Sequence, residues 1–137
     1  SIHPELGAPW QVDKLYYDRI QNYERFHAVY QAIAAERGAD ERSERLLEMF
    51  RERPLEVTTQ VRCDAYFDQR DAALRSHASQ VAPDSPFFFM PNDVQARVWP
   101  YEDFQLVSSR VTTTVPEHDL FAGVDAGDAG DASAARA

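Results

Sequence analysis

Apolar and polar residues recur with two different periods in the first third of the chain. The segment "VDKLYYDR" at 12–19 is rich in β-favouring side chains, which predicts a short strand. From 20 to 35 the apolar side chains recur three and four positions apart, which predicts a helix that Gly38 would end. A second helix is predicted over 41–53, because apolar side chains gather there and Pro54 would close it.

The middle of the chain combines a strand with a helix. The segment "LEVTTQVRC" at 55–63 alternates between apolar and polar side chains, which predicts a strand. A helix over about 65–80 is expected next, with Asp64 as its N-cap and Pro83 beyond its end.

The last third is predicted to hold two elements and a tail. A short helix is expected over 91–99 with Asn92 as its cap, and a strand over 101–115 that continues outward as an extended arm. The segment 126–137 falls to Ala, Gly, Asp and Ser, which predicts a disordered tail. The order β-α-α-β-α-α-β fits an α/β or α+β fold. Its thin sheet would leave an edge unpaired, so we expect this chain to be part of something larger.

The charge of the chain argues against two classes of partner. Its 137 residues suit one domain, and they carry a net charge of -9 with a pI of about 4.8. A nucleic-acid partner or an anionic membrane surface would need basic stripes, so we expect neither. Neither an apolar run of about 18 residues nor a secretory signal is recognised. Cys63 is the only cysteine, which excludes an internal disulfide and fits a cytoplasmic location.

The residues that usually carry chemistry are scattered. The histidines lie far apart and form none of the paired spacings of a zinc site; they are His3, His27, His77 and His118. Cys63 stands between a strand and a helix, where it could be a nucleophile, but a buried structural cysteine is favoured. We find no nucleophile elbow and no glycine-rich phosphate loop.

The stretch "LRSHASQVAPDSPFFF" at 74–89 holds the strongest candidate binding groups. On a helix, His77 and Gln80 are three positions apart and share a face. In one interpretation His77 packs on the core and donates to a carbonyl oxygen, while Gln80 satisfies the following loop. In the other, both line a polar pocket beside Phe87, Phe88 and Phe89. Spacing favours the first interpretation, because a single histidine on an apolar face is common.

The segment at 57–88, "VTTQVRCDAYFDQRDAALRSHASQVAPDSPFF", resembles the mycothiol S-conjugate amidases, which belong to the LmbE-like, PIG-L-type zinc deacetylases. In that family a "TTxV" strand leads to a helix that ends in "LxAHATQ". Three further segments resemble it in the same order: "PWQVDKLYY" at 9–17, "WPYEDFQLVSSRV" at 99–111 and "PEHDLFAGV" at 116–124.

The resemblance implies a particular part of the family's fold. Residues 1–125 would form the C-terminal half of an LmbE-like amidase domain, a portion of a Rossmann-like fold, and 126–137 its tail. The family binds zinc through "HPDD" and "HPDH" motifs upstream of the "PW" strand, and neither occurs here. We therefore expect zinc in the full-length family, no zinc or catalytic residue on this chain alone, and a missing N-terminal half as its partner.

The function that the resemblance implies is hydrolysis of the amide of a mycothiol S-conjugate, which gives a mercapturate and glucosaminyl-inositol during detoxification. This chain would supply the wall of the substrate cleft, with Gln80 and His77 as substrate-binding residues. That interpretation predicts an exposed apolar strand edge. The alternative is a non-catalytic binding module derived from the family, with that edge capped. A third interpretation, a metal site rebuilt around His3 and His118, is the weakest.

Overall fold

The computed structural model describes residues 5, 10–83, 85, 88 and 90–124, and their elements follow the predicted order. The strands are β1 (Lys14–Asp18), β2 (Thr59–Arg62) and β3 (Tyr101–Ser109). The helices are α1 (Tyr23–Arg37), α2 (Glu41–Arg51), α3 (Phe67–Arg75) and α4 (Asn92–Val98), with a 3-10 turn, Asp64–Tyr66, ahead of α3. The expected α/β mixture and the order β-α-α-β-α-α-β are therefore confirmed.

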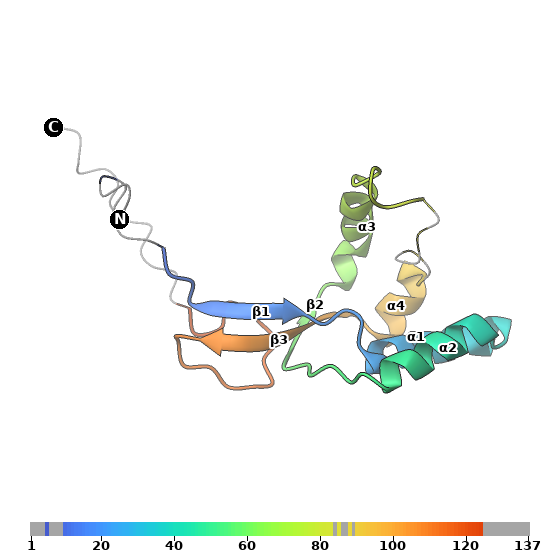
Figure 1. Cartoon of the computed structure of the whole chain (residues 1–137), viewed down its shortest axis with the longest axis horizontal. Helices are drawn as coiled ribbons and strands as arrows, with labels where there is room; N and C mark the ends of the chain where they lie inside the picture. Colours follow the sequence, from blue (N-terminus) through green and yellow to red (C-terminus); the bar gives the residue numbers. More distant parts are fainter. Residues whose placement is uncertain (1–4, 6–9, 84, 86–87, 89, 125–137) are drawn as a thin grey trace.

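The sheet is open and antiparallel, with the order β1-β3-β2. β3 is its longest strand and pairs with both others, so the last strand along the chain lies in the middle. Tyr16 pairs with Leu106, and the register shifts between Leu15 and Tyr16. Figure 1 shows the helices gathered at one end of this sheet, so the side chains at that end come from many parts of the chain.

The first two helices form a hairpin whose ends are fixed by polar side chains and a glycine. Asn22 caps α1 by accepting a hydrogen bond from the Arg25 amide at 2.9 Å, and Asp40 caps α2. Gly38 ends α1 with a φ of 88°, as the sequence predicts. Phe26 packs on Phe50 with ring centroids 4.3 Å apart, which joins the two helices.

The helix predicted over 65–80 is wrong at both ends. The Asp64 carboxylate lies 2.9 Å from Arg62 and does not cap α3. At the other end α3 stops at Arg75, well before Pro83. The hydroxyl of Ser76 donates to the Ala72 carbonyl oxygen at 3.0 Å, so a polar side chain satisfies a terminal carbonyl that another helical turn would have used.

Two expectations for the last third also need correction. The residue before α4 is Pro91, and Asn92 makes no cap because it is the first residue of the helix itself; its side-chain oxygen accepts from Arg70 at 3.1 Å. β3 ends at Ser109, so the predicted strand over 101–115 was too long. The predicted tail at 126–137 lies outside the described residues.

The interior of the described part of the chain is more polar than apolar. The buried apolar side chains there are Val29, Phe67 and Val94. The buried polar ones are Asn22, Arg25, Thr59, Gln95, Asp103 and Glu117. Burying polar groups costs free energy unless they are paired, so the hydrogen bonds and ion pairs of these side chains offset that cost. None of the helices in the described ranges is long and apolar enough to cross a membrane.

Candidate functional site

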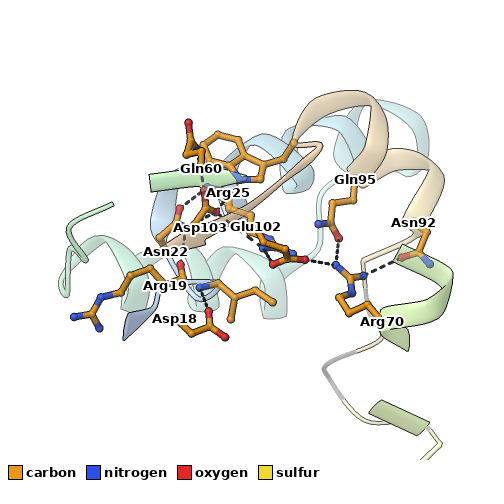
Figure 2. Close-up of polar contacts among 12 residues, drawn as sticks. Asp18, Arg19, Asn22, Arg25, Gln60, Arg70, Asn92, Gln95, Glu102 and Asp103 are labelled. Atoms are coloured by element: carbon orange, nitrogen blue, oxygen red, sulfur yellow. Dashed lines mark hydrogen bonds and ion pairs between the residues drawn. The ribbon is translucent and has the colours of Figure 1, made fainter. Parts of the chain in front are cut away.

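Asp103 of β3 is fully buried and organises the junction of four elements. Its carboxylate accepts hydrogen bonds from Asn22 Nδ2 at 2.8 Å and Gln60 Nε2 at 2.9 Å (Figure 2). It also accepts one from Trp99 Nε1 at 2.8 Å. These donors come from the N-cap of α1, the C-cap of α4 and strand β2. Three neutral donors on one buried carboxylate fix the orientation of each donor side chain. We call Asp103, Asn22, Gln60 and Trp99 the Asp103 centre.

An open groove of about 290 Å³ lies over the Asp103 centre. It is lined by Asn22, Glu24, Leu55, Val57, Thr58, Gln60, Trp99 and Pro116. Three of the lining side chains belong to the Asp103 centre, so the floor of the groove is held rigidly. A small groove with a few fixed polar groups and apolar walls is typical of a small-molecule site.

A second, partly buried network is built on Glu102, the residue of β3 next to Asp103. Glu102 accepts hydrogen bonds from Arg25 Nη1 and from Arg70 Nη1, each at 2.8 Å (Figure 2). Arg25 also lies 4.0 Å from the Asp103 carboxylate, so it links the two networks. Gln95 is buried beside them and accepts from Arg70 at 3.3 Å. The network joins α1, α3 and α4 to the sheet.

A third polar cluster holds the segment after β3 against the sheet. The Lys14 ammonium donates to Glu117 at 2.7 Å and to the Ala122 carbonyl oxygen at 3.0 Å. Tyr16 donates its hydroxyl to the same carboxylate, and Thr59 donates to it at 3.1 Å. Burial alone would raise the pKa of Glu117, but the hydrogen bonds from Lys14, Tyr16 and Thr59 together hold that pKa below its usual range.

The predicted substrate-binding residues, His77 and Gln80, lie away from the groove over the Asp103 centre. His77 and Gln80 are exposed and lie in a turn after the end of α3. In this turn the backbone N–H of Gln80 donates to the backbone carbonyl oxygen of His77 at 2.8 Å. The premise that they share a helical face is therefore wrong. His77 Nδ1 lies 3.0 Å from the Ala73 carbonyl oxygen, as one interpretation predicts, but its ring is not packed in the core. Neither side chain lines the groove.

The aromatic block beside them is only partly described. Arg75 lies over the ring of Phe88, 3.7 Å from its centroid. Phe87 and Phe89 lie outside the described residues, so the pocket that the second interpretation places beside the block remains a prediction.

The described residues offer no donor set that fits a zinc ion. No group of three or more His, Cys, Asp or Glu side chains comes together in them. His118 lies against the Gln60 carbonyl oxygen at 3.2 Å, and His27 stacks on Tyr23. His3 is outside the described ranges.

Cys63 is only partly buried, whereas the sequence predicts a buried structural cysteine. Burial raises the pKa of its thiol, and the nearby Glu102 carboxylate raises it further. Its amide donates to the Pro100 carbonyl oxygen at 2.9 Å. A thiol with a raised pKa is a poor nucleophile at neutral pH, which favours the structural role.

Sequence reasoning missed the Asp103 centre and the groove above it. The available signal was the pair Glu102 and Asp103 inside a segment with strand-like alternation, since an acidic side chain on each face of a strand suggests buried partners. The positions of Asn22, Gln60 and Trp99 gave no comparable signal, because their distance from Asp103 depends on the tertiary fold.

Comparison with curated proteins gives clear relatives. The chain is 37% identical to a mycothiol S-conjugate amidase from Streptomyces coelicolor over 123 residues, which cover 88% of this chain and 42% of the amidase. It is 44% identical over 89 residues to a 1D-myo-inositol 2-acetamido-2-deoxy-alpha-D-glucopyranoside deacetylase from Acidothermus cellulolyticus, covering 61% of this chain and 30% of the deacetylase. A second deacetylase, 1D-myo-inositol 2-acetamido-2-deoxy-alpha-D-glucopyranoside deacetylase 2 from Frankia alni, is 31% identical to this chain. The match covers 90% of this chain and 45% of that deacetylase.

The chain thus spans less than half the length of these relatives. No protein-family model matches the chain, and no solved structure matches it significantly.

Proposed function

This chain belongs to the LmbE-like family of the mycothiol S-conjugate amidases and the related inositol acetamido-glucopyranoside deacetylases, and from that premise we propose that it acts as part of a zinc-dependent mycothiol S-conjugate amidase. The observation that carries the proposal is the match to the amidase along nearly the whole chain. The described residues do not fit a zinc ion, so zinc and its ligands would belong to the region of the relatives beyond the match.

The packing of the described residues supports a role as part of a larger unit. Their fully buried apolar side chains are Val29, Phe67 and Val94, a core too small to stabilise a domain of this size by itself. At the sheet, Leu15 and Tyr17 of β1 are 45% and 52% exposed, and Val107 of β3 is 42% exposed. Apolar side chains on an open sheet suit burial against further chain.

In the complete enzyme, the sheet described above would be the C-terminal portion of a Rossmann-like fold. Residues 1–125 would complete the amidase domain and supply one wall of its substrate cleft. The single cysteine fits a cytoplasmic enzyme, because structural disulfides are rare in that compartment.

His77 and Gln80 remain the proposed substrate contacts of this wall. Both are exposed beyond α3, and Figure 1 shows that α3 leads the chain away from the sheet. The Gln80 side-chain amide can donate to and accept from sugar hydroxyls. The His77 ring nitrogen that does not face the Ala73 carbonyl oxygen has no hydrogen-bond partner among the described residues.

The first experiment is hydrolysis of a fluorescent mycothiol S-conjugate with zinc supplied. The chain is assayed alone and after addition of a separately expressed N-terminal half from a family member. We expect hydrolysis only in the mixture. Activity of the chain alone would contradict the assignment of zinc to another region. Association of the two halves without any hydrolysis would overturn the amidase proposal and favour the non-catalytic binding module.

The role of Gln80 is tested in the active mixture. Gln80→Ala is expected to raise KM about tenfold with little change in kcat, which is the loss of a ground-state contact. Gln69→Ala is the matched control, because Gln69 is an exposed glutamine on α3. Equal KM values for the two variants would remove Gln80 from the substrate site.

A further inference from the structure

We propose that Arg75 is a positioning residue, which closes the segment after α3 into a loop and so holds His77 and Gln80 in place for the substrate. Its side chain reaches past both of them, to Pro83 and to Phe88 further along the chain. The proposal deepens the proposed function and rests on it for the role of His77 and Gln80 as substrate contacts. Arg75 itself is given no contact with the substrate.

The main contact of Arg75 is with an aromatic ring. Its guanidinium group lies over the face of Phe88, 3.7 Å from the ring centroid, which is the shortest cation–π distance among the described residues. Phe88 is half-buried, so the contact is partly shielded from water. Arg75 Nη1 also lies 3.5 Å from the Pro83 carbonyl oxygen, which adds a weak polar contact. Together these contacts join the end of α3 to the far side of the segment.

Successive turns of the backbone bring the segment back toward α3. The described residues of the segment are 76–83, 85 and 88. The backbone N–H groups of Gln80 and Val81 donate to the His77 carbonyl oxygen at 2.8 and 2.9 Å, and the N–H of Phe88 donates to the Ser85 carbonyl oxygen at 3.0 Å. Single turns exposed to water open easily. A contact that spans several turns is therefore needed to fix the positions of His77 and Gln80.

The other end of the segment is fixed at α4. Asn92, the first residue of α4, donates to Asp68 at 2.9 Å and to Asp71 at 3.2 Å on α3. Its side-chain oxygen accepts from Arg70, which also donates to Glu102 of β3 at 2.8 Å (Figure 2). Both ends are thus attached to the same helix, which lowers the entropy that a further contact in the segment must overcome.

The order of this segment matters for the proposed substrate contacts. His77 Nδ1 lies 3.0 Å from the Ala73 carbonyl oxygen, so its ring faces the end of α3. Gln80 is exposed, and its side-chain amide makes no hydrogen bond with the described residues. Only the backbone therefore holds Gln80 in position. A binding group that is held in place beforehand loses less freedom when a ligand binds, so closing the loop with Arg75 should strengthen substrate binding.

The competing explanation is that Arg75 only interacts with the dipole at the C-terminus of α3. Arg37 is the last residue of α1, as Arg75 is of α3, and both side chains are exposed. Among the described residues, a ring lies under Arg75 and none lies under Arg37. Lysine would satisfy a helix dipole, but it lacks the planar guanidinium group that stacks on a ring. Arg75→Lys and Arg37→Lys therefore separate the two explanations.

The first measurement follows the order of the loop by amide hydrogen exchange in NMR. Only this chain is ¹⁵N-labelled, and it is mixed with the separately expressed N-terminal half. The reporters are the backbone N–H groups of Gln80 and Val81. We expect Arg75→Lys to speed their exchange about two- to fivefold, which corresponds to the loss of an exposed cation–π contact, and Arg37→Lys to leave it unchanged. Unchanged exchange in Arg75→Lys would overturn the proposal.

The second measurement asks whether the order of the loop reaches the substrate. In the active mixture, Arg75→Lys is expected to raise KM about two- to fivefold with little change in kcat, because substrate binding alone is weakened. In a background that carries both His77→Ala and Gln80→Ala, the same substitution should change KM much less, because the side chains through which Arg75 acts are gone. Equal changes in KM in the two backgrounds would overturn the positioning role.

The outcomes separate this proposal from the amidase proposal. An inactive mixture in which Arg75→Lys speeds exchange at Gln80 would overturn the amidase function and leave Arg75 as the residue that closes the loop. An active mixture in which Arg75→Lys changes neither the exchange nor KM would overturn the role of Arg75 and keep the amidase function.

Discussion

The ammonium of Lys14 donates to the carboxylate of Glu117 at 2.7 Å, and the two residues are 103 positions apart along the chain. Their side chains are only 3% and 4% exposed. The pair joins the first strand to the segment after the last strand. Removing one partner would leave the other charge buried and uncompensated, so both are needed where β1 meets the segment after β3.

Breaking this buried pair should destabilise the fold far more than breaking a surface pair. Glu117→Gln leaves the Lys14 ammonium buried without a counter-charge, and we expect a loss of about 3–5 kcal/mol in the free energy of unfolding. Glu41→Gln is the control, because the Glu41–Arg45 pair is 85% and 81% exposed and should cost at most about 1 kcal/mol. Urea unfolding measures both variants, and similar losses would contradict the proposed weight of the buried pair.

The same pair sets the pH dependence of stability. The pKa of Glu117 is lowered from its ordinary 4.5, because its hydrogen bonds outweigh its burial, so its contribution is present above pH 4.5 and is lost as the pH falls through the lower folded value. The pKa of Lys14 is raised from 10.5, because bonds to Glu117 and Tyr16 outweigh the lowering effect of burial. Its contribution is present below pH 10.5 and is lost as the pH rises through the higher folded value.

The free energy of unfolding, measured with urea from acid to alkaline pH, should therefore fall at both ends of the pH range. We call these two declines the acid arm and the alkaline arm. In Glu117→Gln the acid arm should become shallower, since the group that titrates there has been removed. If the loss of stability at low pH were the same in Glu117→Gln as in the parent protein, other carboxylates would be responsible for it.

The Asp103 centre should lose its order when the carboxylate is neutralised. In Asp103→Asn the new amide nitrogen faces donors, so at least one of Asn22, Gln60 and Trp99 loses its acceptor. We expect a loss of about 3 kcal/mol and a red-shifted Trp99 emission in a Trp10→Phe background. Asp93→Asn, at an exposed site in the first turn of α4, should change stability by a few tenths of a kcal/mol and leave emission unchanged. Normal emission in Asp103→Asn would mean that Asp103 does not position Trp99.

Two glycines with positive φ should respond differently to alanine. Gly123 has a φ of 78°, and an added Cβ would lie 2.7 Å from the Thr112 carbonyl oxygen. Gly38 has a φ of 88° with nothing within 4 Å of such a Cβ. Gly38→Ala should cost only the backbone strain, about 1–3 kcal/mol, and Gly123→Ala should cost more because the backbone must also move. Thermal unfolding compares them, and a smaller loss at Gly123 would show that the Thr112 backbone gives way freely.

The predicted boundaries were accurate where a local signal was strong. Gly38 ends α1 as expected, because its positive φ is a property of the residue itself. The helix after β2 was overestimated because Ser76 and His77 can satisfy terminal carbonyls as well as another helical turn could. Asp64 and Asn92 have good capping side chains, but Arg62 and Arg70 engage their oxygens instead. These choices depend on neighbours that the local sequence does not reveal.

The sequence by itself determined the number, type and order of the elements, because periodicity, glycine and proline act over a few residues. It also carried the resemblance to the amidases, which the relatives confirm. Only the tertiary structure decided that β3 lies between β1 and β2. That order brings Asn22, Gln60 and Trp99 onto the carboxylate of Asp103 and places Lys14 against Glu117. Contacts between distant residues depend on how the strands pair, and no local pattern encodes which strand becomes the central one.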